Sequence, residues 1–172
     1  MQITRTADYG IRVLTHLATL PAGTRLTAAE LAGESRASVT FVAKILQRLV
    51  ASRVVVSHRG FEGGFELGRD PRTVSVLDII TALDGPLCLN ECLPGGAGCD
   101  AAARCAAHDV WARAQAALAS VLAAETLDRL AAASTRSPIE DSRSIEDSRS
   151  PVEDSRSPVA QRFSAAKSVS QG

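Results

Sequence analysis

The segment from Cys88 to His108 limits the fold of this chain more than any other feature. It contains all four cysteines of the 172-residue sequence, and Pro94, Gly95, Gly96 and Gly98 interrupt its middle. Proline and glycine are poorly tolerated inside helices and strands, so we expect this segment to be a loop. The loop divides the chain into elements that precede it and elements that follow it.

The residues before the loop show the periodicity of three helices. The first covers Ala7–Leu20, with Thr6 as the expected cap and Asp8 in the first turn, where a negative charge suits the helix dipole. The second, Thr27–Gly33, opens with the pattern of a capping box. A short turn then leads to a third helix over residues 38–50. Two helices joined by a tight turn, the second with a polar outer face, indicate a helix-turn-helix.

The third helix is expected to enter the major groove of DNA, because the start of a recognition helix contacts base edges there. Its candidate DNA-contacting residues are Ser38, Thr40, Phe41, Lys44 and Arg48. Residues 1–70 carry nine Lys or Arg against six Asp or Glu, which weakly favours a polyanionic partner. The sequence thus predicts that double-stranded DNA is the partner of this part of the chain.

Residues 54–69 are two β-prone runs around a glycine-rich tip, the pattern of a β-hairpin or wing. Arg59 on such a tip suits a narrow minor groove. Glycine permits close approach to the sugar-phosphate backbone, which makes Gly60, Gly63 and Gly64 further candidates for DNA contact. An ordinary surface hairpin has the same pattern, but its place directly after a helix-turn-helix favours the wing.

Further helices are expected at 74–83 and, beyond the loop, at 101–124 and 126–133. The helix over 101–124 is rich in alanine and carries one apolar stripe, formed by Val110, Trp111, Ala114, Leu118, Val121 and Leu122. Such a stripe suits a seam between two subunits, although the helix can instead fold back on its own subunit. From Ser134 onward, charged near-repeats with few large apolar groups predict a disordered tail.

We therefore expect a mainly α protein in four parts. Residues 1–85 form a winged helix-turn-helix DNA-binding domain and 86–108 a cysteine-rich cluster-binding loop. Residues 101–133 form a dimerisation helix with a short final helix, and 134–172 form the tail.

The three cysteines Cys92, Cys99 and Cys105 are the candidate metal ligands, with His108 three residues beyond the last. Thiolates suit iron–sulfur clusters and zinc, and imidazole can replace one of them. Zinc sites usually contain a C-x2-C pair, which is absent here, whereas wide spacing through glycine suits a larger cluster. Within one helix, Cys105 and His108 would face the same side. A structural zinc and a metal-free thiol switch remain alternatives.

The chain resembles the bacterial winged-helix iron–sulfur regulators of the IscR and NsrR type. The resemblance spans residues 1–130 and rests on ITRTADYGIRVLTHLA, HRGFEGGFELGR, LNEC, the three-cysteine loop and CAAHDVW. It implies a homodimeric transcription factor, usually a repressor, with a 2Fe-2S or 4Fe-4S cluster on the three loop cysteines. Arg36 stands where the family often has a turn glycine.

The resemblance implies two different fourth ligands. Asp8 matches the acidic ligand of NsrR-like nitric oxide sensors, where it comes from the partner subunit. His108 matches the ligand of IscR-like regulators of cluster-assembly genes, and Cys88 is a third candidate.

The favoured function is a regulator whose operator binding is controlled by an iron–sulfur cluster and which senses nitric oxide or redox state. The IscR-type role is the alternative. An electron-transfer protein is a rival that the helix-turn-helix argues against, and no phosphate loop, Ser/His/Asp set or H-E-x-x-H motif favours an enzyme. The sequence shows no secretory pattern and no apolar run of transmembrane length, so we expect a cytoplasmic protein with no membrane partner.

Overall fold

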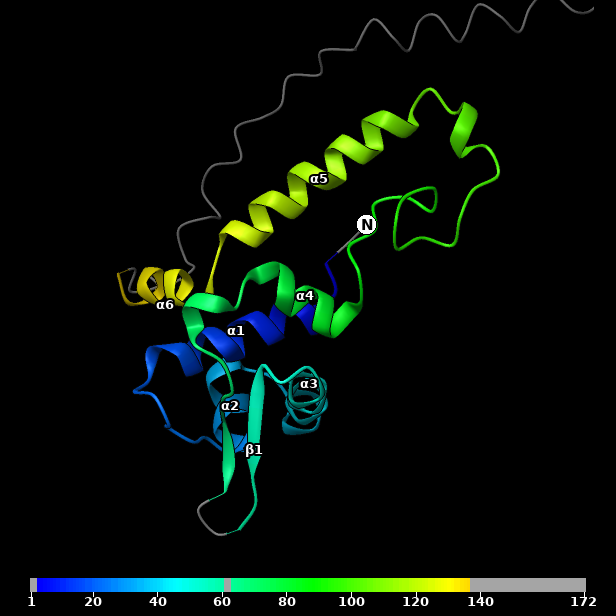
Figure 1. The fold of residues 1–172 in the computed structure, drawn as a ribbon. Helices are drawn as coiled ribbons and strands as arrows, with labels where there is room; N and C mark the ends of the chain where they lie inside the picture. The colour runs from blue at the N-terminus through cyan, green and yellow to red at the C-terminus, as the bar shows by residue number, and fades with distance from the viewer. Residues whose placement is uncertain (1–2, 61–62, 137–172) are drawn as a thin grey trace, which may run out of the picture. The chain divides into compact units, whose positions relative to one another are not determined.

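The computed structural model describes residues 3–60 and 63–136 and is largely helical (Figure 1). The helices are α1 (Arg5–Thr19), α2 (Ala28–Ser35), α3 (Val39–Ala51), α4 (Val76–Asp84), α5 (His108–Ala124) and α6 (Leu127–Arg136). The strands are β1 (Val55–His58) and β2 (Gly64–Leu67), and short 3-10 turns cover Pro71–Thr73 and Ala102–Arg104. The predicted mainly helical winged fold is confirmed. The disordered tail was predicted to begin at Ser134, which is wrong for residues 134–136 because α6 continues to Arg136. The rest of the predicted tail, residues 137–172, lies outside the described residues.

Side-chain caps define where the first three helices begin. The Thr4 hydroxyl accepts from the amide of Ala7 at 3.2 Å, so α1 starts two residues earlier than expected and Thr6 lies inside it. The capping box of Thr27 and Glu30 opens α2 as expected, and Ser38 caps α3. These local hydrogen bonds satisfy amide groups that no helix turn can satisfy.

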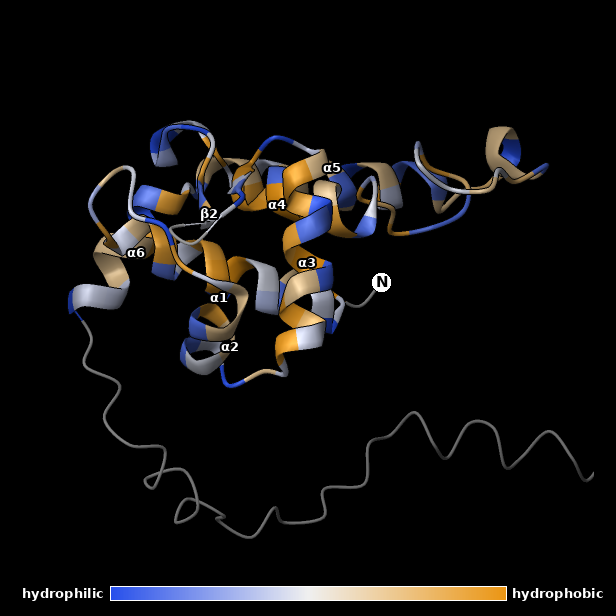
Figure 2. Cartoon of the chain, turned by 90° about the horizontal axis from the view of Figure 1, so that it is seen from below, coloured by the Kyte–Doolittle hydropathy of each residue, from blue (hydrophilic) through white to orange (hydrophobic). Residues whose placement is uncertain are grey.

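The main hydrophobic core lies where α1, α2, α3 and α4 meet, and Figure 2 shows hydrophobic residues along these helices. Its fully buried side chains are mostly Leu, Ile and Val, including Leu14, Leu31, Ile45, Leu46, Leu49 and Ile79. Leu127 of α6 is also buried in this core. The final helix therefore packs on the domain at the other end of the sequence, against α1.

The wing is an antiparallel hairpin of β1 and β2 in which Val55 pairs with Leu67 and His58 with Gly64. Phe65 also exchanges backbone hydrogen bonds of 2.8 and 3.1 Å with Leu26, which ties the wing to the segment before α2. Gly64 is required at this junction because a Cβ there would lie 2.9 Å from the Leu26 carbonyl oxygen. Residues 61 and 62 of the tip are outside the described part.

The helix predicted over 101–124 begins only at His108, after the 3-10 turn of residues 102–104. Its inner side contacts α4, where Leu122 packs beside Ala7, Val76 and Ile80. Backbone bonds from Val76 to Glu125 and from Leu127 to Val74 close the connection between α5 and α6 onto the start of α4. Among the helices of residues 3–60 and 63–136, none combines the length and apolarity that crossing a bilayer requires.

Candidate DNA interface and cysteine loop

The first half of α3 presents a polar surface. Ser38, Thr40 and Lys44 are exposed, and Thr40 and Lys44 lie one turn apart on the same face. Phe41, also predicted to contact DNA, is half-buried and packs edge-on against Tyr9 with ring centroids 5.5 Å apart. The Thr40 hydroxyl and the Lys44 ammonium group are therefore free to reach bases and phosphates, whereas the Ser38 hydroxyl also accepts from the Phe41 amide at 3.3 Å.

Arg48 is held differently from Lys44. Its Nη1 donates a 2.6 Å hydrogen bond to the backbone carbonyl of Leu83, at the end of α4. The predicted DNA contact of Arg48 thus faces competition from a bond inside the protein, 35 residues away in the sequence.

The turn between α2 and α3 contains Arg36 in the left-handed conformation, with φ 53°. Its amide donates to the carbonyl of Gly33, and the amide of Ala37 donates to that of Ala32, which ends α2 and redirects the chain. The left-handed region favours glycine, so this position has the backbone of a turn glycine with an arginine side chain.

The wing places Arg59 and Gly60 at its exposed tip, with Gly63 just before the returning strand and Gly64 at its start. A Cβ at Gly63 would lie 2.5 Å from the carbonyl oxygen of His58, so the narrow tip itself depends on glycine. The positions predicted to approach DNA therefore also shape the hairpin.

A charged cluster that the sequence patterns did not predict lies along the wing. Glu66 accepts from His58 Nε2 at 2.8 Å and from Arg25 Nε at 3.4 Å. The hydrogen bond from His58, and then the charges of His58 and Arg25, hold the pKa of Glu66 below its ordinary value. The three residues come from separate segments, and no local pattern joins Arg25 to a residue 41 positions away.

The first part of the cysteine loop is a compact turn. The amide of Gly98 donates to Glu91 at 2.9 Å, and those of Gly96 and Leu93 donate within the same turn. The Leu93 side chain is buried, whereas Cys88 and Cys92 are half-buried. The Cys88 thiol bonds to the carbonyl of Asn90 at 3.1 Å. Cys92 thus lies on a segment with its own backbone structure.

Gln115 of α5 holds this turn. Its Oε1 accepts from the amide of Leu89 at 2.9 Å, and its Nε2 donates to the carbonyl of Pro94 at 3.4 Å. One half-buried side chain therefore links the turn of residues 89–98, the Cys92 turn, to α5 at two points.

The second part of the loop is open. Cys99 and Cys105 are exposed, and within the described residues no three Cys, His, Asp or Glu side chains converge into a metal site. Cys105 has extended backbone and precedes α5, so the expectation that it shares a helical face with His108 is wrong. The structure places Cys92 in an ordered turn, and the other two predicted ligands are exposed and do not complete a group of three with it.

The two candidate fourth ligands differ in their surroundings. His108 begins α5, and its Nδ1 is buried without a hydrogen-bond partner among the described residues. Asp8 pairs with Arg12 of the same helix at 3.0 Å. Buried polar atoms normally have a hydrogen-bond partner. The unpartnered Nδ1 of His108 is therefore a ring nitrogen that can accept a hydrogen bond or bind a metal. Three thiols with one such imidazole are a donor set that fits a cluster.

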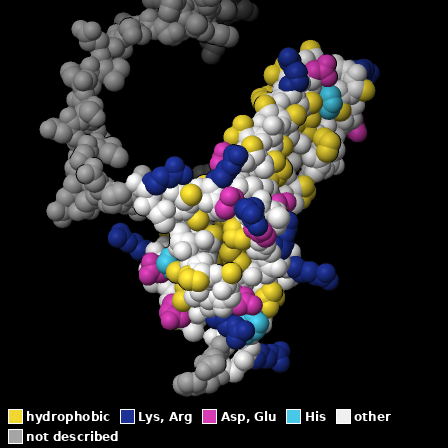
Figure 3. Space-filling view, turned by 60° about the vertical axis from the view of Figure 1, so that its left-hand side comes forward, with side chains coloured by type: hydrophobic (Ala, Val, Ile, Leu, Met, Phe, Trp, Pro, Cys, Tyr) yellow, Lys and Arg dark blue, Asp and Glu magenta, His cyan; other side chains and the backbone are white. Residues whose placement is uncertain are grey.

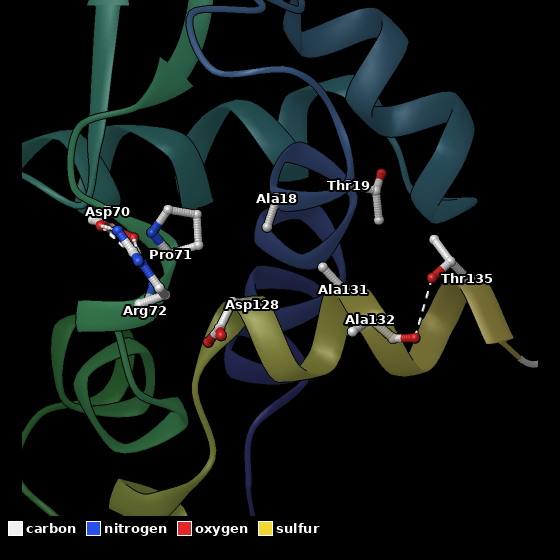
Figure 4. A pocket seen from close by; sticks show the side chains of 9 residues that line it. All are labelled: Ala18, Thr19, Asp70, Pro71, Arg72, Asp128, Ala131, Ala132 and Thr135. Carbon is white, nitrogen blue, oxygen red and sulfur yellow. Dashed lines mark hydrogen bonds and ion pairs between the residues drawn. The ribbon is translucent and has the colours of Figure 1, made fainter.

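Away from the loop, two neighbouring hollows of about 420 and 470 Å³ share Ala18, Asp70 and Pro71. Figure 4 shows the first, between the end of α1, the turn at Pro71 and α6. Arg72 bonds to Asp70 at 2.6 Å, and these hydrogen bonds lower the pKa of Asp70 to about 2. The charged pair is mutually satisfied, and alanines form much of the remaining lining.

The chain is similar in sequence to known transcriptional regulators. A sequence model of a family described as iron-dependent transcriptional regulator, Rrf2, matches residues 3–133. A protein of Mycobacterium tuberculosis strain H37Rv, named as an HTH-type transcriptional regulator, is 35% identical over 127 residues, which are 74% of this chain and 79% of that relative.

Two solved structures extend the comparison. CymR, the global cysteine regulator of B. subtilis, shares 27% identity with a TM-score of 0.64, over 77% of this chain and 98% of CymR. IscR of T. potens shares 21% identity with a TM-score of 0.65, over 82% and 93%, and supports the fold alone.

Proposed function

Because the chain belongs to the Rrf2 family of iron-dependent transcriptional regulators, we propose that it is a dimeric repressor whose operator binding is controlled by an iron–sulfur cluster. Its family and relatives are transcriptional regulators rather than enzymes. The observation that carries the proposal is the loop of residues 88–108, where three thiols and a histidine with a buried, unpartnered nitrogen follow a winged helix-turn-helix.

The DNA-binding surface combines α3 and the wing. Ser38, Thr40 and Lys44 enter the major groove, and Arg59 enters the minor groove with Gly60 beside the backbone. Phe41 supports α3 from inside through Tyr9. A two-fold dimer presents two such surfaces, so the operator has two related half-sites.

The dimer seam is the outer face of α5. Four small or branched apolar residues recur on it at helical spacing and are exposed: Val110, Ala114, Ala117 and Val121. Val110 is 51% and Val121 63% exposed, and Trp111 beside them is 41% exposed. Figure 3 shows hydrophobic side chains along this helix. An apolar stripe of this kind, opposite the side that packs on α4, suits a parallel stripe on a second copy.

Cys92, Cys99 and Cys105 hold the cluster in this proposal, with His108 as fourth ligand. A bound cluster supplies an iron centre at which a small oxidant or nitric oxide reacts. In this proposal the exposed segment 99–107 closes toward Cys92 when the ligands gather, since the described residues contain no group of three side chains arranged to hold a metal. Cluster status therefore changes the order of the loop that connects α4 to α5.

Two signals remain as candidate functions. Sensing of nitric oxide or redox state, with the partner's acidic residue as ligand, is the first. The second candidate function is control of operator binding by the supply of iron–sulfur clusters. The unpartnered His108 nitrogen favours this function, because Asp8, the ligand expected for the first, is already paired with Arg12. A metal-free thiol switch is the third reading, prompted by the likeness to a cysteine regulator.

The test is iron and sulfide analysis with an absorption spectrum on protein purified without oxygen. We expect matching iron and sulfide in the wild type, loss of both on changing Cys92, Cys99 and Cys105 to Ala, and retention in the matched control Cys88→Ala. Stoichiometric zinc, or no metal after reconstitution, would overturn the cluster proposal.

The fourth ligand is tested by the same spectrum. If His108 is the ligand, His108→Ala shifts the absorption bands and Asp8→Ala leaves them in place. The reverse pattern assigns Asp8 and supports the nitric oxide reading. Titration of the wild type with nitric oxide and with an iron chelator, followed by operator binding, then separates the two signals.

A further inference from the structure

We propose that Arg48 is not a DNA contact but a positioning residue that, together with Asp84, couples the cysteine loop to the recognition helix. This inference rests on the proposed function. The two residues act at the α4 end, defined here as Leu83 and Asp84, the last two residues of α4 before the loop.

The Leu83 side chain packs between α1 and α3. A Cβ at Gly10 of α1 would lie 2.2 Å from Leu83 Cδ1 and 3.6 Å from Ile45 Cγ2, so the glycine leaves the space that Leu83 fills. Leu83 is 3% and Ile45 0% exposed. The α4 end is therefore fitted into a tight contact among three helices, where interiors shift between discrete arrangements rather than deform smoothly.

The Leu83 backbone is held by the recognition helix. The carbonyls of a last helical turn lack partners within the helix, and a cation there is favoured by the helix dipole. Arg48 provides both a hydrogen-bond donor and a positive charge at this helix end, because its guanidinium donates to the Leu83 carbonyl at 2.6 Å. A movement of the α4 end thus acts directly on the second half of α3.

Asp84 ties the same point to the start of α1. Both of its carboxylate oxygens accept from the hydroxyl of Thr4, at 2.7 and 2.8 Å. Thr4 is also the cap of α1. The α4 end is therefore connected to two helices of the DNA-binding domain through independent bonds.

The α4 end lies close to the cysteine loop. Gly85, with φ 89°, is the one residue between Asp84 and Pro86, and Pro86 lies 3.3 Å from the Cβ position of Gly95 in the Cys92 turn. A rearrangement of the loop when its ligands gather or separate therefore acts one residue away from the α4 end. Arg48 then changes the placement of α3.

The test compares Arg48→Met with Lys44→Met, two changes that remove one positive charge from the same helix. Operator affinity is measured for full-length protein with and without reconstituted cluster, over a series of salt concentrations. The probe is a duplex selected from a random-sequence pool by the wild-type protein. Each cation that contacts a phosphate contributes about 0.9 to the slope of log affinity against log salt.

We expect Lys44→Met to lower that slope by about 0.9 in both forms while the ratio of their affinities stays as in the wild type. Arg48→Met should leave the slope unchanged and alter the ratio by roughly 2- to 30-fold. Asp84→Ala, which changes an exposed carboxylate of α4 rather than a residue of α3 or the wing, should alter the ratio in the same direction.

The outcomes separate this inference from the proposed function. If the wild type binds equally with and without cluster, the proposed function fails. If the wild type responds to the cluster but Arg48→Met lowers the salt slope and keeps the wild-type ratio, Arg48 is a phosphate contact and the coupling inference is overturned. If Asp84→Ala also keeps the wild-type ratio of affinities with and without cluster, the α4 end does not couple the loop to α3.

Discussion

Two residues hold backbone positions that are unusual for their type. Gly10 lies inside α1, where glycine costs about 0.5–1 kcal/mol relative to alanine, and Arg36 takes a left-handed turn at a cost of roughly 1–2 kcal/mol. Gly10 is explained by the close contact with Leu83. Arg36 is the C-cap of α2 and lies in the turn into α3, so its left-handed backbone ends one helix and directs the chain toward the next.

Gly10→Ala should destabilise the protein although alanine is the better helix former. The new methyl group overlaps Leu83 in a buried contact, so we expect a loss of about 1–3 kcal/mol in the free energy of unfolding by urea. Gly33→Ala is the matched control, because Gly33 of α2 has open space around its Cβ position. It should gain about 0.5–1 kcal/mol. Equal gains in both variants would contradict the tight contact at Leu83.

Asp70→Asn should lower stability in a pH-dependent way. Hydrogen bonds from Arg72 reduce the pKa of Asp70 from 3.8 to about 2 in the folded protein, so the folded state binds fewer protons than the unfolded state. The stabilisation is complete above pH 3.8 and disappears as the pH falls through about 2. Denaturant melts of the two proteins should therefore converge over this window.

Arg72→Gln removes the guanidinium of the same pair but keeps the hydrogen bond from the backbone amide of residue 72, so it should reproduce part of the Asp70→Asn profile. If the free energies of unfolding of wild type and Asp70→Asn differ by the same amount at every pH from 5 to 2, the pair does not hold the carboxylate ionised.

At the scale of elements, the Cys92 turn is held to α5 through Gln115. Gln115→Leu keeps the volume and removes both hydrogen bonds, so the amide of Leu89 should exchange with deuterium roughly fivefold faster, as for a loss of about 1 kcal/mol. Gln115→Glu retains the accepting oxygen and should keep Leu89 protected. Unchanged exchange in Gln115→Leu would mean that the turn stays closed by its own backbone bonds.

The elements were predictable from sequence where the signal is local. The cap at Ser38, the capping box at Thr27 and the wing all follow from residues within a few positions of one another, and the structure confirms them. The start of α5 was not predictable, because residue 107 has no side-chain cap and the alanines before it suit a helix equally well. Contacts such as Arg48 with Leu83 join distant segments and leave no periodic trace.

At the scale of the whole molecule, the exposed face of α5 should decide the oligomeric state. Val121→Glu places a charge in the proposed seam, at its most exposed large apolar residue, and we expect the dimer dissociation constant to rise about tenfold or more, equivalent to about 1.4 kcal/mol. Light scattering after size-exclusion chromatography measures it. Ser120→Glu adds the same charge to an exposed neighbour that points away from the stripe.

A wild-type monomer at micromolar concentration, or a Val121→Glu variant that dimerises as tightly as Ser120→Glu, would move the interface away from α5.

Leu93 is the one residue between 86 and 107 whose side chain is buried, and the remainder of that loop contributes nothing to the described core. Because the loop adds so little to the core, its residues can change or be replaced while the winged domain folds as before. Selection is then free to fit one DNA-reading scaffold with new chemical receptors, provided that the two residues before Gly85 keep their hold on α1 and α3.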